Sequence, residues 1–215
     1  MLLERNDVNP NTANEHGQTP LYIAAWKGHE KVAKPLLGRG DVNPNTTDNF
    51  DQTPLSGAAG EGHHMVVKIL LERNDVNPNT ANRHSQTPIF QAAWKGHEGV
   101  VKTLLERVNV DPNIPDGYGQ TPLSRAACQG HEGVVEALLE RGDVNPNTAD
   151  SFGNTPLGSA AGEGHDMVVK MLLERNDVNP NTTSRYGQMP PFQATCEGHE
   201  EVVEMLPEKL AAATG

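Results

Sequence analysis

The sequence predicts an all-α solenoid, in which antiparallel helix pairs stack on one another and a hairpin-like loop projects between successive pairs. Two observations predict this fold. A Thr-Pro step recurs every 34 residues, and a Gly-His step follows it within each copy. A fixed period of this length is typical of solenoids, in which each unit packs only on its neighbours. The Thr-Pro steps begin at Thr19, Thr53, Thr87, Thr121 and Thr155, and Met189-Pro190 is a degraded sixth copy.

The first helix of each unit is expected to begin at the Thr-Pro step. The threonine oxygen can accept from the free N–H groups of the first turn, and proline has no N–H to leave unpaired there. In the clearest copy, residues 41–74, this helix runs through Leu55 and Ala59. The Gly-Glu-Gly run at 60–62 should end it, because glycine tolerates positive φ.

The second helix of that copy is expected to begin at about His64. Its apolar residues between Val66 and Leu71 form one stripe at helical spacing, which should be buried. Arg73 and Asn74 should end the helix, since a cation suits a helix C-terminus and asparagine tolerates the left-handed conformation. The Asp-Val-Asn-Pro-Asn run that follows predicts an extended or hairpin-like link.

These residues resemble the ankyrin repeat family, whose units carry a TPLxxAAxxGHxxVVxxLL pattern followed by a β-hairpin loop. The resemblance covers about residues 7–206 in six units, and it implies a right-handed solenoid of the ankyrin type. In two respects the chain departs from the family. The histidine that often follows TPL is replaced in every copy, and the period is 34 where the family usually has 33. Tetratricopeptide repeats share the 34-residue period, but their aromatic and Leu-Gly signature is missing.

We expect one domain over residues 1–215. Residues 1–6 match the end of a second helix and would be the tail of a preceding repeat, which indicates a piece of a longer protein. Pro35 falls inside the second helix of repeat 1 and should weaken it by about 3 kcal/mol. Residues 209–215 begin with KLAAA, which is typical of adjacent cloning sites; the alternative is a native alanine-rich helix end. The repeats span residues 7–40, 41–74, 75–108, 109–142, 143–176 and 177–208.

The composition favours a protein partner over nucleic acid or membrane. With 17 basic and 28 acidic residues the net charge is −11, which argues against binding a phosphate backbone. The absence of a long apolar run or a leader predicts no membrane span and a cytoplasmic, intracellular protein. Cys128 and Cys196 occupy equivalent positions two repeats apart, about 20 Å by helix spacing, so no disulfide is expected. We expect a monomer.

The chain has nine histidines, which raises the question of a metal site, but six of them belong to the Gly-His steps. A residue that recurs once per repeat is expected to be structural, here bonding backbone across its own turn. His63 and His64 adjoin but lack the other ligands of a metal site. The sequence has no nucleophile elbow, phosphate loop or paired-carboxylate motif. We therefore expect no catalytic residue, metal or cofactor, and no enzyme.

One ring side chain recurs near the tip of each loop. The rings would either contact a partner, because rings bring contact area at low entropic cost, or pack on the neighbouring loop and stiffen the row. The six positions are His16, Phe50, His84, Tyr118, Phe152 and Tyr186.

The two positions after each Ala-Ala pair line the concave face in ankyrin proteins. Trp26 and Trp94 occupy the first of them on either side of repeat 2, which offers only Ser56, Gly57 and Gly60. Either two aromatic walls enclose a groove with a small-residue floor, or the indoles fold over Gly60 to fill its missing volume. The pairs are Trp26-Lys27, Gly60-Glu61, Trp94-Lys95, Cys128-Gln129, Gly162-Glu163 and Cys196-Glu197.

We therefore expect a protein–protein interaction module, a scaffold that binds another protein through the concave face and loop tips. The alternative is a structural spacer or regulatory segment of a larger multidomain protein, with no direct ligand of its own. Aromatic residues at the variable positions favour binding. The expected contact residues are Trp26, Lys27, Glu61, Trp94, Lys95, Gln129, His16, Phe50, His84 and Tyr118.

Overall fold

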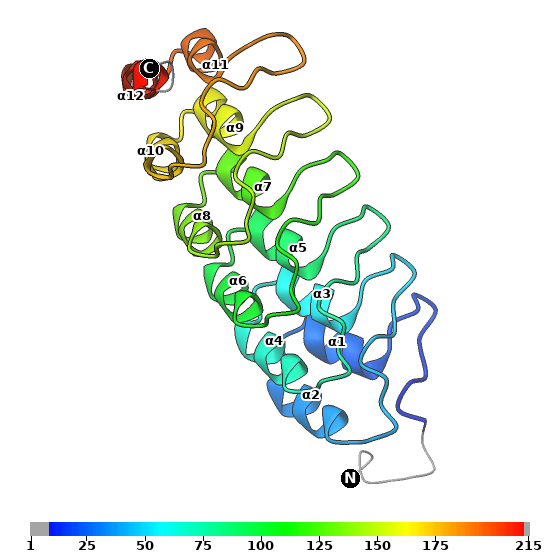
Figure 1. The fold of residues 1–215 in the computed structure, drawn as a ribbon. Helices are drawn as coiled ribbons and strands as arrows, with labels where there is room; N and C mark the ends of the chain where they lie inside the picture. Colours follow the sequence, from blue (N-terminus) through cyan, green and yellow to red (C-terminus); the bar gives the residue numbers. More distant parts are fainter. Residues whose placement is uncertain (1–8, 213–215) are drawn as a thin grey trace. The chain divides into compact units, whose positions relative to one another are not determined.

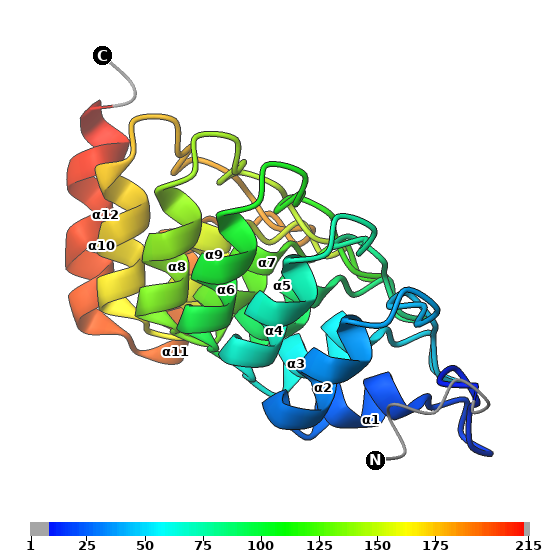
Figure 2. The ribbon, with the colours of Figure 1, turned by 90° about the horizontal axis from the view of Figure 1, so that it is seen from below.

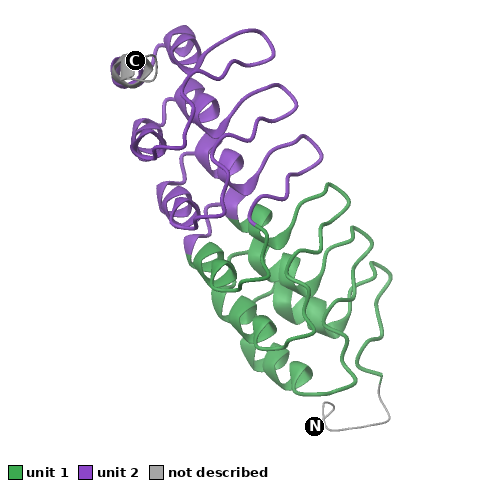
Figure 3. Cartoon of the chain, in the orientation of Figure 1, with its two compact units in different colours: residues 1–92, 99–111 green, residues 93–98, 112–215 purple. Residues whose placement is uncertain are grey.

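The structure is a computed structural model that describes residues 9–212, with side chains to residue 206. Within this range it has twelve helices and no strand, so the predicted all-α arrangement of helix pairs is confirmed (Figure 1). The chain forms two compact units, whose described parts are residues 9–92 with 99–111 and residues 93–98 with 112–212 (Figure 3). The expected tail of a preceding repeat, residues 1–6, lies outside the described residues.

In the first unit each inner helix is followed by an outer helix that packs against it. The inner helix α1 packs on α3, and the outer helix α2 packs on α4. The boundary between the two units falls within the third pair. The helices are α1 (Pro20–Trp26), α2 (Glu30–Leu37), α3 (Pro54–Gly60), α4 (His64–Leu71), α5 (Pro88–Trp94) and α6 (Glu98–Leu105).

The second unit repeats this arrangement. The inner helix α9 packs between α7 and α11, and the outer helices α8, α10 and α12 lie side by side (Figure 2). The loops extend from the inner helices, away from the outer ones (Figure 1). The helices are α7 (Pro122–Cys128), α8 (Glu132–Leu139), α9 (Pro156–Gly162), α10 (Asp166–Glu174), α11 (Pro190–Glu197) and α12 (Glu200–Ala212).

The predicted helix starts and turns are confirmed. The Thr53 hydroxyl accepts from the N–H of Ser56 at 3.1 Å at the start of α3, and the other threonines of the Thr-Pro steps cap their helices in the same way. Met189, which replaces threonine before α11, makes no side-chain cap. Gly62 has φ of 76°, in the left-handed region that favours glycine.

The core of each unit is built from leucine, valine and alanine. The stripe predicted on the second helix is confirmed, since Val66, Val67, Leu70 and Leu71 are buried in α4. The Ala-Ala pairs of the inner helices α1, α3, α5, α7 and α9 are also buried, as at Ala58. Small side chains at that position allow the helices to approach closely.

The expected end of the outer helix at a left-handed Asn74 is wrong. Helix α4 ends at Leu71 with a right-handed cap, and in residues 9–212 the only non-glycine residues with positive φ are Asp51 and Ser85. Arg73 has a different role. Its guanidinium pairs with the carboxylate of Asp75 and donates to the carbonyl oxygens of Leu37 and Arg39 in the preceding repeat.

The Gly-His histidines are structural as expected, but they do not bond across their own turn. The Nε2–H of His63 donates to the carbonyl oxygen of Trp26 in the preceding repeat at 2.9 Å. His131, His165 and His199 bond the preceding repeat in the same way. The ring of His63 also fills the space beside Gly28, since a Cβ there would lie 2.5 Å from its Nδ1.

The Asn-Pro-Asn loop contains an asparagine ladder that the sequence did not reveal. The first asparagine, as at Asn43, makes a local turn by accepting from the N–H of Asn45. The second bridges to the next repeat: the Asn45 amide donates to Asp75 O at 2.6 Å and accepts from Asn77 N at 2.9 Å. Asn11, Asn79, Asn113 and Asn147 do the same in their repeats.

Pro35, expected to weaken the second helix of repeat 1, lies inside a helix, and so does Pro207 near the other end of the chain. Pro35 is accommodated in α2, which is eight residues long, as α4 is. Pro207 lies within α12, which continues to Ala212 and so includes part of the tail assigned to cloning sites. The loss of stability expected from Pro35 remains a prediction.

We predict that Asn45→Ala lowers the free energy of unfolding by about 2 kcal/mol, because it leaves a backbone N–H and a carbonyl of the next repeat without partners. The control is Asn181→Ala, because no seventh Asp-Val-Asn-Pro-Asn run follows Asn181 in the sequence. That change should cost less than about 0.5 kcal/mol. Urea unfolding of both variants measures the difference, and equal losses would contradict the bridging role.

Candidate functional site

The inner helices leave exposed side chains at their C-terminal ends. Trp26 is 41% exposed and Trp94 is 37% exposed, whereas the framework residues around them are buried. Lys27 and Glu61 are also exposed, and the Lys27 ammonium lies 5.4 Å from the Trp26 ring centroid. An exposed indole beside a cation offers a large contact area with a polar edge.

The small-residue floor expected in repeat 2 is not open. Gly57 and Gly60 are both buried. A Cβ on Gly57 would lie 3.4 Å from Cβ of Trp26, and one on Gly60 would lie 2.9 Å from Oε1 of Gln91. Trp26 therefore packs against Gly57, and Gln91 fills the space beside Gly60. Neighbouring side chains thus fill the space beside both glycines, which favours the packing alternative, and partner contact by the two tryptophans stays a prediction.

Tyr22 closes the same region from α1. Its ring is buried, with Cε2 3.6 Å from the place of a Cβ on Gly57. Burial, and next the hydrogen bond and charge of Asp48, raise the pKa of the Tyr22 hydroxyl well above its usual range. The tyrosine hydroxyl thus donates to the Asp48 carboxylate of the adjacent loop.

Trp94 belongs to the second unit and has its own partner there. The Arg125 guanidinium from α7 lies over its ring, 4.7 Å from the centroid. Lys95 and Gln129 are exposed beside these residues, and Gln129 makes a long contact of 3.9 Å to the Cys128 sulfur. A guanidinium on an aromatic face orders both side chains and presents them as one surface.

The ring residues of the loop tips are exposed, and their backbones join adjacent loops. His16, Phe50, His84 and Tyr118 all face solvent in part or whole. Their carbonyls link neighbours, as where Asn49 N donates to His16 O at 3.0 Å. Phe50 also carries the Arg83 guanidinium of the next loop, 3.9 Å from its ring centroid. At Phe50 the ring therefore stiffens the row, whereas the Tyr118 ring remains accessible.

The second unit contains a mostly polar groove of about 670 Å³ along the inner helices α7, α9 and α11. Its floor includes Gly158 and Gly162 of repeat 5, which match Ser56 and Gly60 of repeat 2. The sequence analysis did not single out this groove. The signal that could have pointed to it is Cys128, a small residue that lines the groove and stands where repeat 1 has Trp26.

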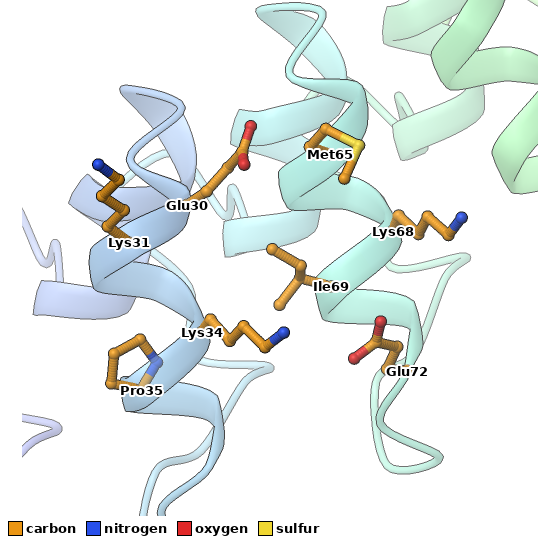
Figure 4. A pocket seen from close by; sticks show the side chains of 8 residues that line it. All are labelled: Glu30, Lys31, Lys34, Pro35, Met65, Lys68, Ile69 and Glu72. Atoms are coloured by element: carbon orange, nitrogen blue, oxygen red, sulfur yellow. The ribbon is translucent and has the colours of Figure 1, made fainter.

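A second hollow of about 540 Å³ lies on the outer side of the first unit, between α2 and α4 (Figure 4). Ile69 lies between the two helices and Lys34 reaches toward α4. The lining combines apolar groups with three lysines and two glutamates. These charges nearly balance, so the hollow has no strong electrostatic preference.

The described residues include no cluster of histidine, cysteine, aspartate or glutamate suited to a metal ion. Cys128 and Cys196 are free thiols. Burial, followed by the Glu163 charge, raises the pKa of the Cys128 thiol, so it is less reactive than an ordinary surface cysteine. Across this part of the chain no helix is both long and apolar enough to cross a membrane.

Comparisons with known proteins agree on one family. Models described as "Ankyrin repeats (3 copies)" match residues 36–116 and 143–213, and two models described as "Ankyrin repeats (many copies)" match residues 2–58 and 95–139. A solved structure titled "Crystal Structure of EF0377 an Ankyrin Repeat Protein" is 28% identical, with a TM-score of 0.81. The alignment covers 90% of this chain and 98% of that one. No curated protein matches the chain.

We predict that the two helix-ending glycines respond differently to alanine. Gly162→Ala should stabilise the fold by about 0.5 kcal/mol, because its Cβ would meet Gln193 at an ordinary 3.7 Å and glycine costs entropy in a helix. Gly60→Ala should be destabilising, because Gln91 must move and break its 2.9 Å bond to Gln52. Thermal unfolding of both variants tests this, and a stabilising Gly60→Ala would show that the site has spare volume.

Proposed function

Because the chain belongs to the ankyrin repeat family, we propose that it is a protein-binding module whose partner contacts the ends of the inner helices and the loop tips. Ankyrin repeats are in general a protein–protein interaction module. For this chain we propose in addition which surface makes the contact.

The observation that carries the proposal is the contrast between framework and surface. The histidines, arginines and asparagines that repeat with the period are bonded to neighbouring repeats. Trp26, Trp94 and Tyr118 stand at the variable positions and are exposed. Tryptophan and tyrosine are enriched among the residues that supply most of the energy of an interface. Exposed charges beside them, such as Lys27, would orient a partner more than hold it.

A structural spacer or regulatory segment of a larger multidomain protein is the second candidate. The observation that favours it is Phe50, where a tip ring is used to join two loops. A spacer has no reason to expose two indoles at equivalent positions, so binding is the better supported function.

The proposal includes no catalytic activity. It includes a cytoplasmic location, which two free cysteines support because thiols stay reduced in that compartment. It also includes a monomeric state, a scaffold role for the array, and no nucleic-acid partner, in keeping with the net charge of −11.

The test is capture of binding proteins from a cell extract by the chain and by two double variants. Trp26→Ala/Trp94→Ala should reduce the capture of specific partners about tenfold or more, since an interface anchor is worth about 2 kcal/mol. Met65→Ala/Met167→Ala removes outer-helix side chains of similar exposure, 45% and 42%, and should leave capture unchanged.

Circular dichroism of both variants shows whether they remain folded. Equal losses from the two double variants would contradict a site on the inner-helix side. So would an unchanged capture by the folded tryptophan variant.

A further inference from the structure

The groove of the second unit lies beside a small residue, Cys128, where the first unit has a tryptophan. The chain has a 102-residue correspondence, in which Ser124 matches Tyr22 and Cys128 matches Trp26. In the first unit Tyr22 and Trp26 lie against Gly57. In the second unit Cys128 and Ser159, the counterpart of Gly57, line the groove of about 670 Å³ over α9, and Ser124 is buried.

The same replacement leaves a carboxylate facing the groove. Asp48 in the first unit is held by the Tyr22 hydroxyl, whereas its counterpart Asp150 lines the groove of the second unit. One Asp150 oxygen accepts from the backbone N–H groups of Phe152 and Asn154, which fixes the direction of the side chain.

Two more carboxylates line the groove, Glu163 and Glu197, and its lining includes no lysine or arginine. Neither glutamate has a hydrogen bond or ion pair with another of the described side chains. The charges of Glu163 and Asp150 both raise the pKa of the Cys128 thiol, which places them around the same volume. The nearby cation, Arg125, is engaged by the Trp94 ring and by Gln120 Oε1 at 3.4 Å.

An aromatic ring completes the groove, and the chain itself shows what such a ring accepts. In the first unit the Arg83 guanidinium lies over Phe50 and donates to Asn49 O at 3.2 Å. The counterpart of Phe50 is Phe152, which is exposed and lines the groove. No cation among the described residues lies over its ring. The counterpart of Arg83 is Arg185, whose backbone N–H donates to Phe152 O at 2.7 Å but whose guanidinium does not lie over the Phe152 ring. That ring face is therefore free in this conformation.

We propose that the groove over α9 binds an extended, arginine-bearing segment of a partner protein, with a guanidinium on the Phe152 ring and between the carboxylates of Asp150 and Glu163. Gly162 leaves room in the floor, whereas Gln193 fills the space beside Gly158, and Glu197 accepts a second basic residue. Arginine fits better than lysine because its planar group both stacks on a ring and pairs with carboxylates. The proposal rests on the protein-binding function and names the class of partner for one surface.

The test uses a dye-labelled peptide of alternating arginine and serine, and a matched peptide with citrulline in place of arginine. Fluorescence anisotropy with the full chain at physiological salt should show binding of the arginine peptide only. Glu163→Gln/Glu197→Gln should weaken it about fivefold or more. Glu140→Gln/Glu174→Gln makes the same charge change on the outer helices and should have no effect beyond general screening.

A variant that leaves the charge unchanged separates the groove from a general acidic surface. Ser124→Tyr/Cys128→Trp/Ser159→Gly installs the residues that fill this region in the first unit, and it should abolish binding of the arginine peptide. Its fold is checked by circular dichroism, and Phe152→Ala, at an exposed ring, provides a second neutral variant that should weaken binding.

Three results would overturn the proposal: no binding of the arginine peptide, equal binding of the citrulline peptide, or equal losses from the two glutamate pairs. None of these results would contradict the broader protein-binding function, because that function is tested separately by partner capture with the tryptophan variant.

Discussion

The fold depends on polar side chains that bond the backbone of an adjacent repeat. His63 donates to Trp26 O and Arg73 to Leu37 O of the preceding repeat, and Asn45 bonds both Asp75 O and Asn77 N of the next. Backbone groups in irregular loops need partners as much as those in helices do. Periodic side chains supply these partners, so long loops can be held on a modest core of leucine, valine and alanine.

The same bonds distinguish the residues that hold the fold together from those that can vary on its surface. A histidine ring occupies the space beside Gly28, so that glycine is required both by its φ of 68° and by the neighbouring repeat. Positions committed in this way cannot vary without loss of stability. The side chains after the Ala-Ala pair and at the loop tips make no bond that recurs in every repeat, and they differ among repeats.

The period and the capping residues made the helices predictable, because Thr53, Gly62 and the stripe in α4 act within their own repeat. Contacts between repeats were harder to predict. The two asparagines of the Asn-Pro-Asn run look alike in sequence, yet Asn43 makes a local turn and Asn45 bridges to the next repeat. The floor at Gly60 depends on Gln91, a residue in the following repeat, and the sequence pattern of repeat 2 alone does not contain it.

If coupling between neighbouring repeats holds the structure together, then stability should vary from repeat to repeat. Native-state hydrogen exchange of the full chain, resolved by residue, measures this most directly. The account predicts graded opening free energies along residues 9–212, with the least protected amides in repeats 1 and 6, which have a neighbour on one side in the sequence. A single opening free energy shared by amides of all six repeats would contradict it.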